Sequence, residues 1–138
     1  MITLGIIGLG KWGRNYLSAI NEIDSSIKVI VGNRLNWYEL VKSKQCDGII
    51  IATPPDSHIK IAMEVLQTNT PVMIEKPLAI NHNEALQLQE FENNSIILVN
   101  HLQLFSPAFE FIKKTLHPTD ILSIFSQGSN DGPIRTYS

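Results

Sequence analysis

Short apolar runs alternate with stretches of helical periodicity along most of the chain. Runs in which neighbouring positions are all apolar predict strands buried on both faces, and they lie at 3–8, 27–31, 49–51, 72–74, 96–99 and 121–125. Apolar residues that recur every three or four positions predict helices at 12–23, 35–44, 57–66, 82–91 and 107–114. Strands that alternate with helices are typical of βαβ units, so we expect an α/β fold: a doubly wound parallel sheet of about six strands.

Residues with strong positional preferences mark the ends of several elements. Consecutive prolines at 54–55 end the third strand, because proline cannot donate to a ladder. Asn81 and Glu84 have the spacing of a capping box ahead of a helix. Ser106 followed by Pro107 predicts another helix start, with proline at the first helical position.

The tail of the chain differs from the rest. Residues 126–138 are rich in Gly, Ser and Asn and have no periodicity. We therefore expect one α/β domain over residues 1–120, and over 121–138 either the start of a truncated further domain or a disordered tail.

Composition excludes several classes of function. The 138 residues are 43% hydrophobic and 17% charged, with a formal net charge of -2, which suits one compact domain without a strong field. Nucleic-acid binding begins with phosphate neutralisation, and the basic residues form no cluster, so we exclude that class. No apolar run approaches the roughly 20 residues that cross a bilayer, so we expect no membrane segment.

Cysteine and histidine give no sign of a metal centre. Cys46 is the single cysteine, so no internal disulfide forms, and the four histidines are dispersed without metal-ligand spacing. A reducing compartment fits best, and we expect a cytoplasmic protein.

A glycine motif, G-x-G-x-x-G, follows the first predicted strand and opens the first predicted helix: Gly8, Leu9, Gly10, Lys11, Trp12 and Gly13. In this context the motif predicts a dinucleotide-binding (Rossmann) loop. Gly8 makes the tight turn, Gly10 lets the backbone approach a pyrophosphate, and Gly13 lets helix and strand pack closely. The phosphates then lie at a helix N-terminus. The alternative is a glycine turn without a ligand, and Trp12 packs either on the loop or against a neighbouring helix.

The end of the second strand informs the choice between cofactors. An acidic residue usually binds the adenosine ribose there, but this chain has Asn33 and Arg34. Asn33 hydrogen-bonds a hydroxyl without repelling a phosphate, and Arg34 pairs with one. The cofactor is therefore NAD(P), with a preference for NADP. Alternatively, Arg34 is a solvated surface residue.

Three further segments add to the glycine loop: 52–58 (Ala-Thr-Pro-Pro-Asp-Ser-His), 75–77 (Glu-Lys-Pro) and 99–107. Together they resemble the Gfo/Idh/MocA family of NAD(P)-dependent oxidoreductases, which act largely on sugars and other polyols. The Glu-Lys-Pro tripeptide directly after a strand is the specific part. An arginine that the family often has near its Phe-x-Pro is replaced by Leu104.

The resemblance implies roles for the tripeptide. Lys76 is the catalytic candidate, a lysine beside nicotinamide and substrate that polarises or deprotonates the reacting hydroxyl during hydride transfer. A lysine suits this role because desolvation and nearby cations readily lower its pKa. Glu75 lines the nicotinamide side of the pocket. Pro77 follows a peptide bond that is often cis in the family, although sequence alone favours trans.

Other cofactor-binding candidates lie near these strand ends. By the resemblance, Thr53 and Pro54 line the dinucleotide through backbone and hydroxyl contacts. His58 lies on the first turn of the next helix and is either a ligand contact or a surface or capping residue. His101 follows an apolar strand, and it either approaches the nicotinamide or is a structural histidine.

Family members are usually more than twice as long, with a second α/β domain that supplies an Asp-x-x-x-His motif. That motif does not occur in these 138 residues, so the substrate domain is expected to be absent. Asn130, Gly132, Pro133 and Arg135 resemble a pattern of members that act on nucleotide-linked or amino sugars. We expect the cofactor half of a sugar or sugar-nucleotide dehydrogenase, inactive alone and prone to homo-oligomerise. The alternative is a non-catalytic nucleotide-binding or interaction module.

Overall fold

The computed structural model describes residues 1–91, 94–117, 119, 121–123 and 125. The chain divides into two compact units, Met1–His101 and Leu102–Ser138. In chain order, the first unit holds β1 (Thr3–Ile7), α1 (Lys11–Ile23), β2 (Lys28–Gly32), α2 (Trp37–Lys42), β3 (Gly48–Ile51), η1 (Pro55–Ser57), α3 (His58–Leu66), β4 (Val72–Ile74), α4 (His82–Leu86), η2 (Gln87–Phe91) and β5 (Ile97–Val99). The second unit holds η3 (Leu102–Phe105) and α5 (Pro107–Thr115).

In the described residues the strands form one parallel five-stranded sheet in the order β2-β1-β3-β4-β5. The chain moves from β1 to one side to form β2, and then crosses back to form β3 on the other side of β1. This reversal makes the carboxyl end of β1 the topological switch point, where open α/β sheets bind ligands. The doubly wound parallel sheet predicted from the sequence is confirmed.

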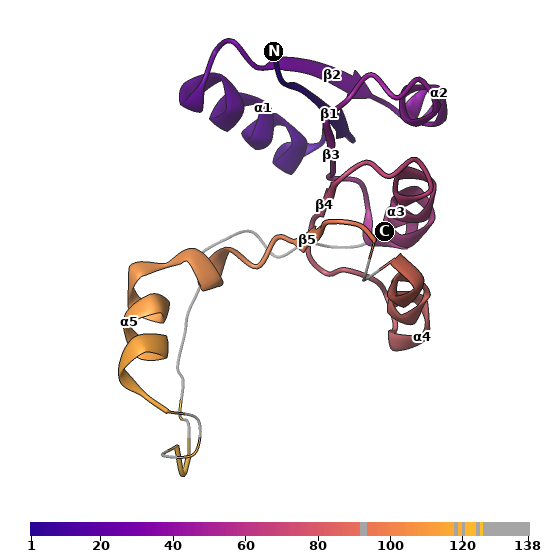
Figure 1. Cartoon of the computed structure of the whole chain (residues 1–138). Coiled ribbons are helices and arrows are strands. Elements are labelled where there is room, and N and C mark those ends of the chain that lie inside the picture. The colour runs from indigo at the N-terminus through magenta and orange to yellow at the C-terminus, as the bar shows by residue number, and fades with distance from the viewer. Residues whose placement is uncertain (92–93, 118, 120, 124, 126–138) are drawn as a thin grey trace. The chain divides into compact units, whose positions relative to one another are not determined.

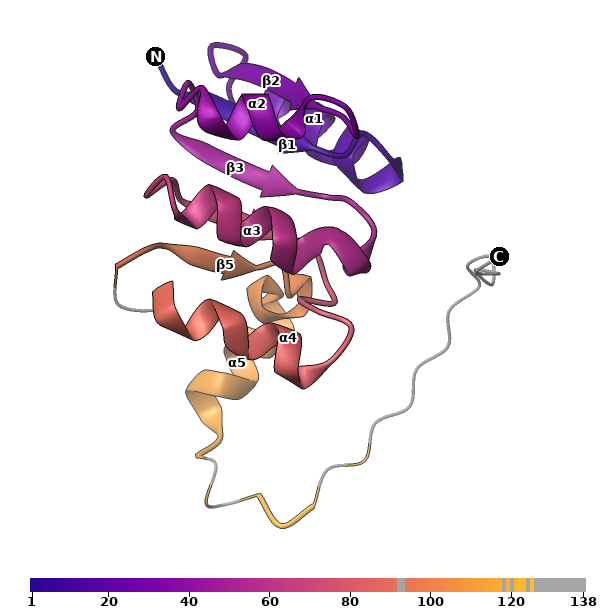
Figure 2. The ribbon, with the colours of Figure 1, turned by 90° about the vertical axis from the view of Figure 1, so that its right-hand side faces the viewer.

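Helices cover the two faces of the sheet unequally. Figure 1 shows α1 on one side of the strands and α2, α3 and α4 on the other, and Figure 2 views the latter side. The α1 side packs around Ile6, Ile20 and Ile50, whereas the larger cluster around Ile51 and Ile74 packs on the opposite face. Ile6 faces the α1 side and Ile51 faces the opposite side, and both side chains are fully buried. Burial on both faces is what the uninterrupted apolar runs predict.

Two predicted helix starts are confirmed. The Asn81 side chain accepts a hydrogen bond from the Glu84 backbone N–H at 2.9 Å and so caps α4. The Ser106 hydroxyl accepts from the Phe109 N–H at 3.1 Å, with Pro107 as the first residue of α5. Both caps satisfy helix N–H groups that otherwise lack a partner.

The prediction of a sixth strand at 121–125 is wrong. Residues 121–123 and 125, the part of this run that the structure describes, lie in no strand. A strand needs a neighbour for its backbone groups, and within the described residues β5 pairs with β4 alone. Leu122 and Phe125 are 99% and 90% exposed, so the apolar run buries little.

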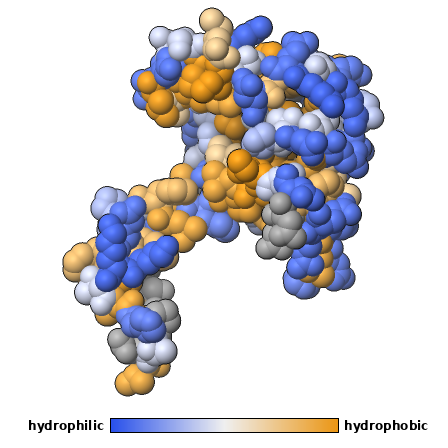
Figure 3. All heavy atoms as spheres, viewed as in Figure 1, coloured by the Kyte–Doolittle hydropathy of each residue, from blue (hydrophilic) through white to orange (hydrophobic). Residues whose placement is uncertain are grey.

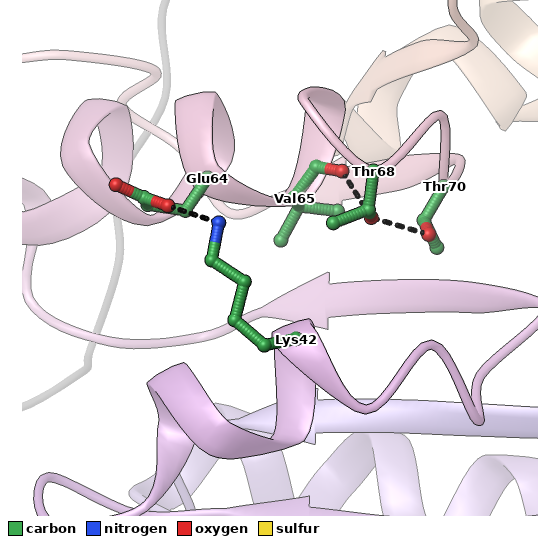
Figure 4. A network of polar contacts seen from close by, with 5 residues as sticks. All are labelled: Lys42, Glu64, Val65, Thr68 and Thr70. Carbon is green, nitrogen blue, oxygen red and sulfur yellow. Dashed lines mark hydrogen bonds and ion pairs between the residues drawn. The ribbon is translucent and has the colours of Figure 1, made fainter.

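Helices α2 and α3 are joined at the surface. Lys42 Nζ lies 2.8 Å from Glu64 Oε2, and beyond α3 the Thr68 hydroxyl donates to the Val65 carbonyl and contacts Thr70 (Figure 4). Because the ion pair is solvent-exposed in part, it adds little stability.

Two further observations bear on function. None of the helices in the described residues is long and apolar enough to span a membrane. Within the same residues, His, Cys, Asp and Glu side chains form no group of three or more that could hold a metal ion.

Candidate functional site

Backbone hydrogen bonds continue the sheet one residue beyond its strands and align the predicted site loops. Gly8 N donates to Gly32 O, Ala52 N to Ile7 O, Glu75 N to Ile51 O and Asn100 N to Ile74 O, at 2.9–3.0 Å. The last residue of β2 and the residues that directly follow the other four strands therefore lie side by side along one edge. Their order is Gly32, Gly8, Ala52, Glu75 and Asn100. All the predicted loops of the first unit start from this edge.

Two glycines of the loop are required by crowding. Gly8 has φ +96°, and a Cβ there would lie 2.8 Å from the Ala52 carbonyl oxygen. A Cβ on Gly13 would lie 1.9 Å from the Gly8 carbonyl oxygen. Only glycine avoids these clashes, so both glycines permit the turn and the close approach of α1 to β1 that the motif predicts.

Gly10 is different, because an added Cβ would have no described atom within 4 Å. It is also the N-cap residue of α1, where no side-chain cap is found in the described residues and the first turn has no acidic residue. The N–H groups in the first turn of α1 thus have no side-chain cap in the described residues, and they carry the positive end of the helix dipole. Space and donors together fit a pyrophosphate.

Other residues of the loop are exposed to different degrees. Leu9 and Lys11 are exposed and Trp12 is half-buried. Trp37, by contrast, packs against the core cluster on the α2 side.

After β2, the side chain of Asn33 organises its own loop. Its carbonyl oxygen accepts from the Leu35 N–H at 2.8 Å and the Asn36 N–H at 3.3 Å. Arg34 is exposed. This end of the site therefore presents a side-chain amide and a guanidinium, both donors, and no carboxylate.

His58 connects the loops after β3 and β4. The ring is 1% exposed, with Nε2 2.8 Å from the Thr53 carbonyl oxygen and Nδ1 2.9 Å from the Pro77 carbonyl oxygen. Carbonyl oxygens only accept, so the doubly protonated ring makes both bonds and a neutral ring makes one. His58 is the first residue of α3, as expected, and its buried ring fixes the two loops relative to each other.

The hydroxyl of Thr53 is engaged within its own loop. The Ser57 hydroxyl lies 2.9 Å from the Thr53 hydroxyl and 2.8 Å from the Pro54 carbonyl oxygen, which only accepts. Pro54 follows in extended backbone and precedes η1. Lys76 is exposed, and no ion pair to it occurs within the described residues. The Lys76–Pro77 peptide bond is cis.

Glu75 belongs to a buried polar network that the sequence analysis missed. Its Oε1 accepts from the Tyr16 hydroxyl and, at 2.8 Å, from the Asn100 amide, which also donates to the Tyr16 oxygen. Its Oε2 accepts from the Lys76 backbone N–H at 3.1 Å. Glu75 and Asn100 are 5% and 7% exposed. Burial, and then the Glu75 carboxylate, raise the pKa of Tyr16 far above its ordinary value, so the phenol stays a donor.

The remaining histidines are exposed. His101 is exposed, and its backbone N–H donates to Val99 O at 2.8 Å. His82 is exposed. His117 is exposed and its ring lies 2.7 Å from the Thr119 hydroxyl. The residues expected to point to nucleotide-linked sugars, 130–135, lie outside the described part of the chain.

Comparison with known proteins supports the fold. A family model described as "Oxidoreductase family, NAD-binding Rossmann fold" matches residues 31–101. Inositol 2-dehydrogenase 4 of Saccharopolyspora erythraea is 22% identical over 84% of this chain and 41% of its own length. UDP-N-acetylglucosamine 3-dehydrogenase of Acidithiobacillus ferrooxidans is 23% identical over 80% of this chain and 40% of its own.

A solved structure shares the fold. Myo-inositol 2-dehydrogenase of Lactobacillus plantarum superposes with a TM-score of 0.74 at 18% identity, over 89% of this chain and 43% of that one. The chain thus spans about two fifths of the length of the curated relatives it matches. Because the family model covers just over half of the 138 residues, the chain belongs to the Gfo/Idh/MocA oxidoreductase family and holds its NAD-binding Rossmann domain.

Proposed function

We propose that this chain is the cofactor-binding part of an oxidoreductase that transfers hydride between nicotinamide and a hydroxyl of a sugar, a cyclic polyol or a sugar nucleotide. The open space at Gly10 carries the proposal. It lies at the N-terminus of α1, where the described residues provide no side-chain cap for the helix N–H groups, and at the switch point of the sheet. The inositol and UDP-N-acetylglucosamine dehydrogenases among its relatives support the substrate class.

In this proposal each part of the edge has one task. The loop of Gly8, Leu9, Gly10, Lys11, Trp12 and Gly13 binds the pyrophosphate, and Thr53, Pro54 and the fixed His58 loop support the middle of the dinucleotide. Lys76 places an exposed ammonium beside the reacting hydroxyl, where it donates a hydrogen bond to the oxygen and polarises the O–H bond. The dinucleotide, when bound, supplies the hydride acceptor or donor.

A preference for NADP is part of the proposal. At the end of β2, Asn33 and Arg34 present donors and no carboxylate, so a 2′-phosphate meets no repulsion and gains a cationic partner. Isothermal titration with NADPH and NADH decides the preference. Tighter binding of NADPH is expected, and tighter binding of NADH would remove this part.

We expect little turnover by these 138 residues alone, because they contain no Asp-x-x-x-His motif to supply an acid or base. Fluorescence titration with reduced cofactor tests the binding step without turnover. Saturable binding below millimolar concentration is expected, and its absence at millimolar concentration would contradict the proposal.

A non-catalytic interaction module is the second candidate. Ile96 and Leu98 of the β5 region are 69% and 43% exposed, and apolar residues gather near β5 on the visible surface of the first unit (Figure 3). Such a patch favours self-association. Sedimentation of a clean monomer at high concentration, together with cofactor binding, would exclude this candidate.

The state of Cys46 bears on the compartment. Its thiol is buried and forms no disulfide, which favours a reducing compartment such as the cytoplasm.

A further inference from the structure

The carboxylate of Glu75 is held entirely by neutral donors. Tyr16, Asn100 and the Lys76 backbone N–H supply three kinds of hydrogen bond to its two oxygens. No cationic side chain comes within ion-pair distance of it among the residues that the structure describes. A buried carboxylate usually has an opposite charge beside it, and within the described residues Glu75 has no such partner.

The place of Glu75 along the site edge defines which part of a dinucleotide it meets. Backbone hydrogen bonds order the edge as Gly32, Gly8, Ala52, Glu75 and Asn100. The adenosine ribose belongs at the end of β2 and the pyrophosphate at the glycine loop, so the nicotinamide half extends the other way, over β3 and β4. Glu75 lies two strand spacings from Gly8, about 10 Å, which is within the span of that half.

The two redox states of nicotinamide differ in charge. The oxidised ring carries one positive charge and the reduced ring carries none. Hydride transfer moves two electrons and one proton onto the ring together and removes this charge. A fixed carboxylate nearby, shielded from water, therefore acts differently on the two states.

We propose that Glu75, positioned by Tyr16 and Asn100, makes this site bind the oxidised cofactor in preference to the reduced one. The inference rests on the proposed function, since it needs a nicotinamide dinucleotide at this edge. Tyr16 and Asn100 are positioning residues: they hold the carboxylate and do not themselves meet the ring. The exposed Lys76 ammonium opposes the effect weakly, because water screens it.

The test is the ratio of two dissociation constants. The full chain and its Glu75→Gln variant are titrated calorimetrically with NADP⁺ and NADPH, and again with NAD⁺ and NADH. Glu75→Gln is expected to weaken oxidised relative to reduced cofactor by about threefold or more. Glu64→Gln, the same chemical change in an ion pair on α3, leaves the ratio unchanged. A merely structural role moves both constants together.

The outcomes separate the inference from the proposed function. If the wild-type chain binds neither redox state at millimolar concentration, the proposed function fails and the inference falls with it. If both states bind and Glu75→Gln leaves their ratio unchanged, the inference alone is overturned. Should Glu75→Gln fail to fold, the wild-type chain decides: the inference expects tighter binding of NADP⁺ than of NADPH, and NADP⁺ binding no tighter than NADPH overturns it.

Discussion

In the proposed function, a ligand meets backbone at the glycine loop, whereas at the Glu75–Lys76 turn it meets side chains. The loop offers the N–H groups of a helix end beside the open space at Gly10. The turn offers an exposed lysine above a buried carboxylate whose oxygens are all engaged. The first region is therefore sensitive to added volume, and the second to the loss of a donor. Each prediction below uses this difference.

The largest effect is expected from Gly13→Ala. The new Cβ would lie 1.9 Å from the Gly8 carbonyl oxygen, so α1 must move away from β1. We expect a loss of more than about 3 kcal/mol in the free energy of unfolding, measured by urea denaturation. Wild-type stability in this variant would mean that the loop and helix are not packed as described.

Gly10→Ala makes the same change where an added Cβ has no described atom within 4 Å. Stability should change by less than about 1 kcal/mol, while affinity for the dinucleotide falls about tenfold or more, because the methyl group occupies the space of the pyrophosphate. Urea denaturation and cofactor titration give the two numbers. Equal losses of affinity in this variant and in a remote surface variant would contradict the assignment.

Tyr16→Phe tests the turn by removing a donor without adding volume. The carboxylate of Glu75 loses one hydrogen bond, at a cost of about 1–2 kcal/mol in the free energy of unfolding. Cofactor affinity should change less than in Gly10→Ala, because the pyrophosphate space is intact.

The same variant changes the dependence of stability on pH. In the folded chain the pKa of Tyr16 lies far above the ordinary value of 10.0 that the unfolded chain retains. The stability contributed by the neutral phenol is thus complete below about pH 10 and falls as the pH rises beyond it. Unfolding followed at several pH values should show this fall, smaller in Tyr16→Phe. An equal fall in both proteins would assign it to other groups.

The smallest effect is expected from Glu64→Gln. Its partner Lys42 is 39% exposed and lies at 2.8 Å, and such surface pairs contribute about 0.5 kcal/mol or less. Salt should reduce even this difference in urea denaturation. A loss as large as that of Tyr16→Phe would show that buried and exposed carboxylates do not differ in the way described.

The fold was predictable where a local signal coincides with burial. Uninterrupted apolar runs gave the five strands that pair, and the caps at Asn81 and Ser106 marked helix starts correctly. The run at 121–125 has the same local character, but a strand also requires a neighbour, and that requirement is not visible in a short apolar run. Pairing is a tertiary property.

The two regions of the site differ in the same way. The glycine loop is continuous in sequence, so its spacing predicts its geometry. The network joins residues separated by 59 and 84 positions. In the sequence, the periodicity of residues 12–23 groups Tyr16 with Leu17 and Ile20 on one helix face, which indicates packing and not a polar role. One signal was available: a tyrosine hydroxyl and an Asn100 amide beside buried strands both require partners. Nothing in the sequence indicated that Glu75 was that partner.

Amide chemical-shift mapping by NMR tests the central claim most directly. The labelled 138-residue chain is titrated with NADPH, and the assigned backbone amide signals are followed. The account predicts the largest shifts at Gly10, Lys11 and Gly13, and further shifts at Asn33 and Lys76 along the same sheet edge. Shifts confined to the opposite end of the strands, or to the hollow lined by Ala85, Leu88 and Ile97, would contradict it.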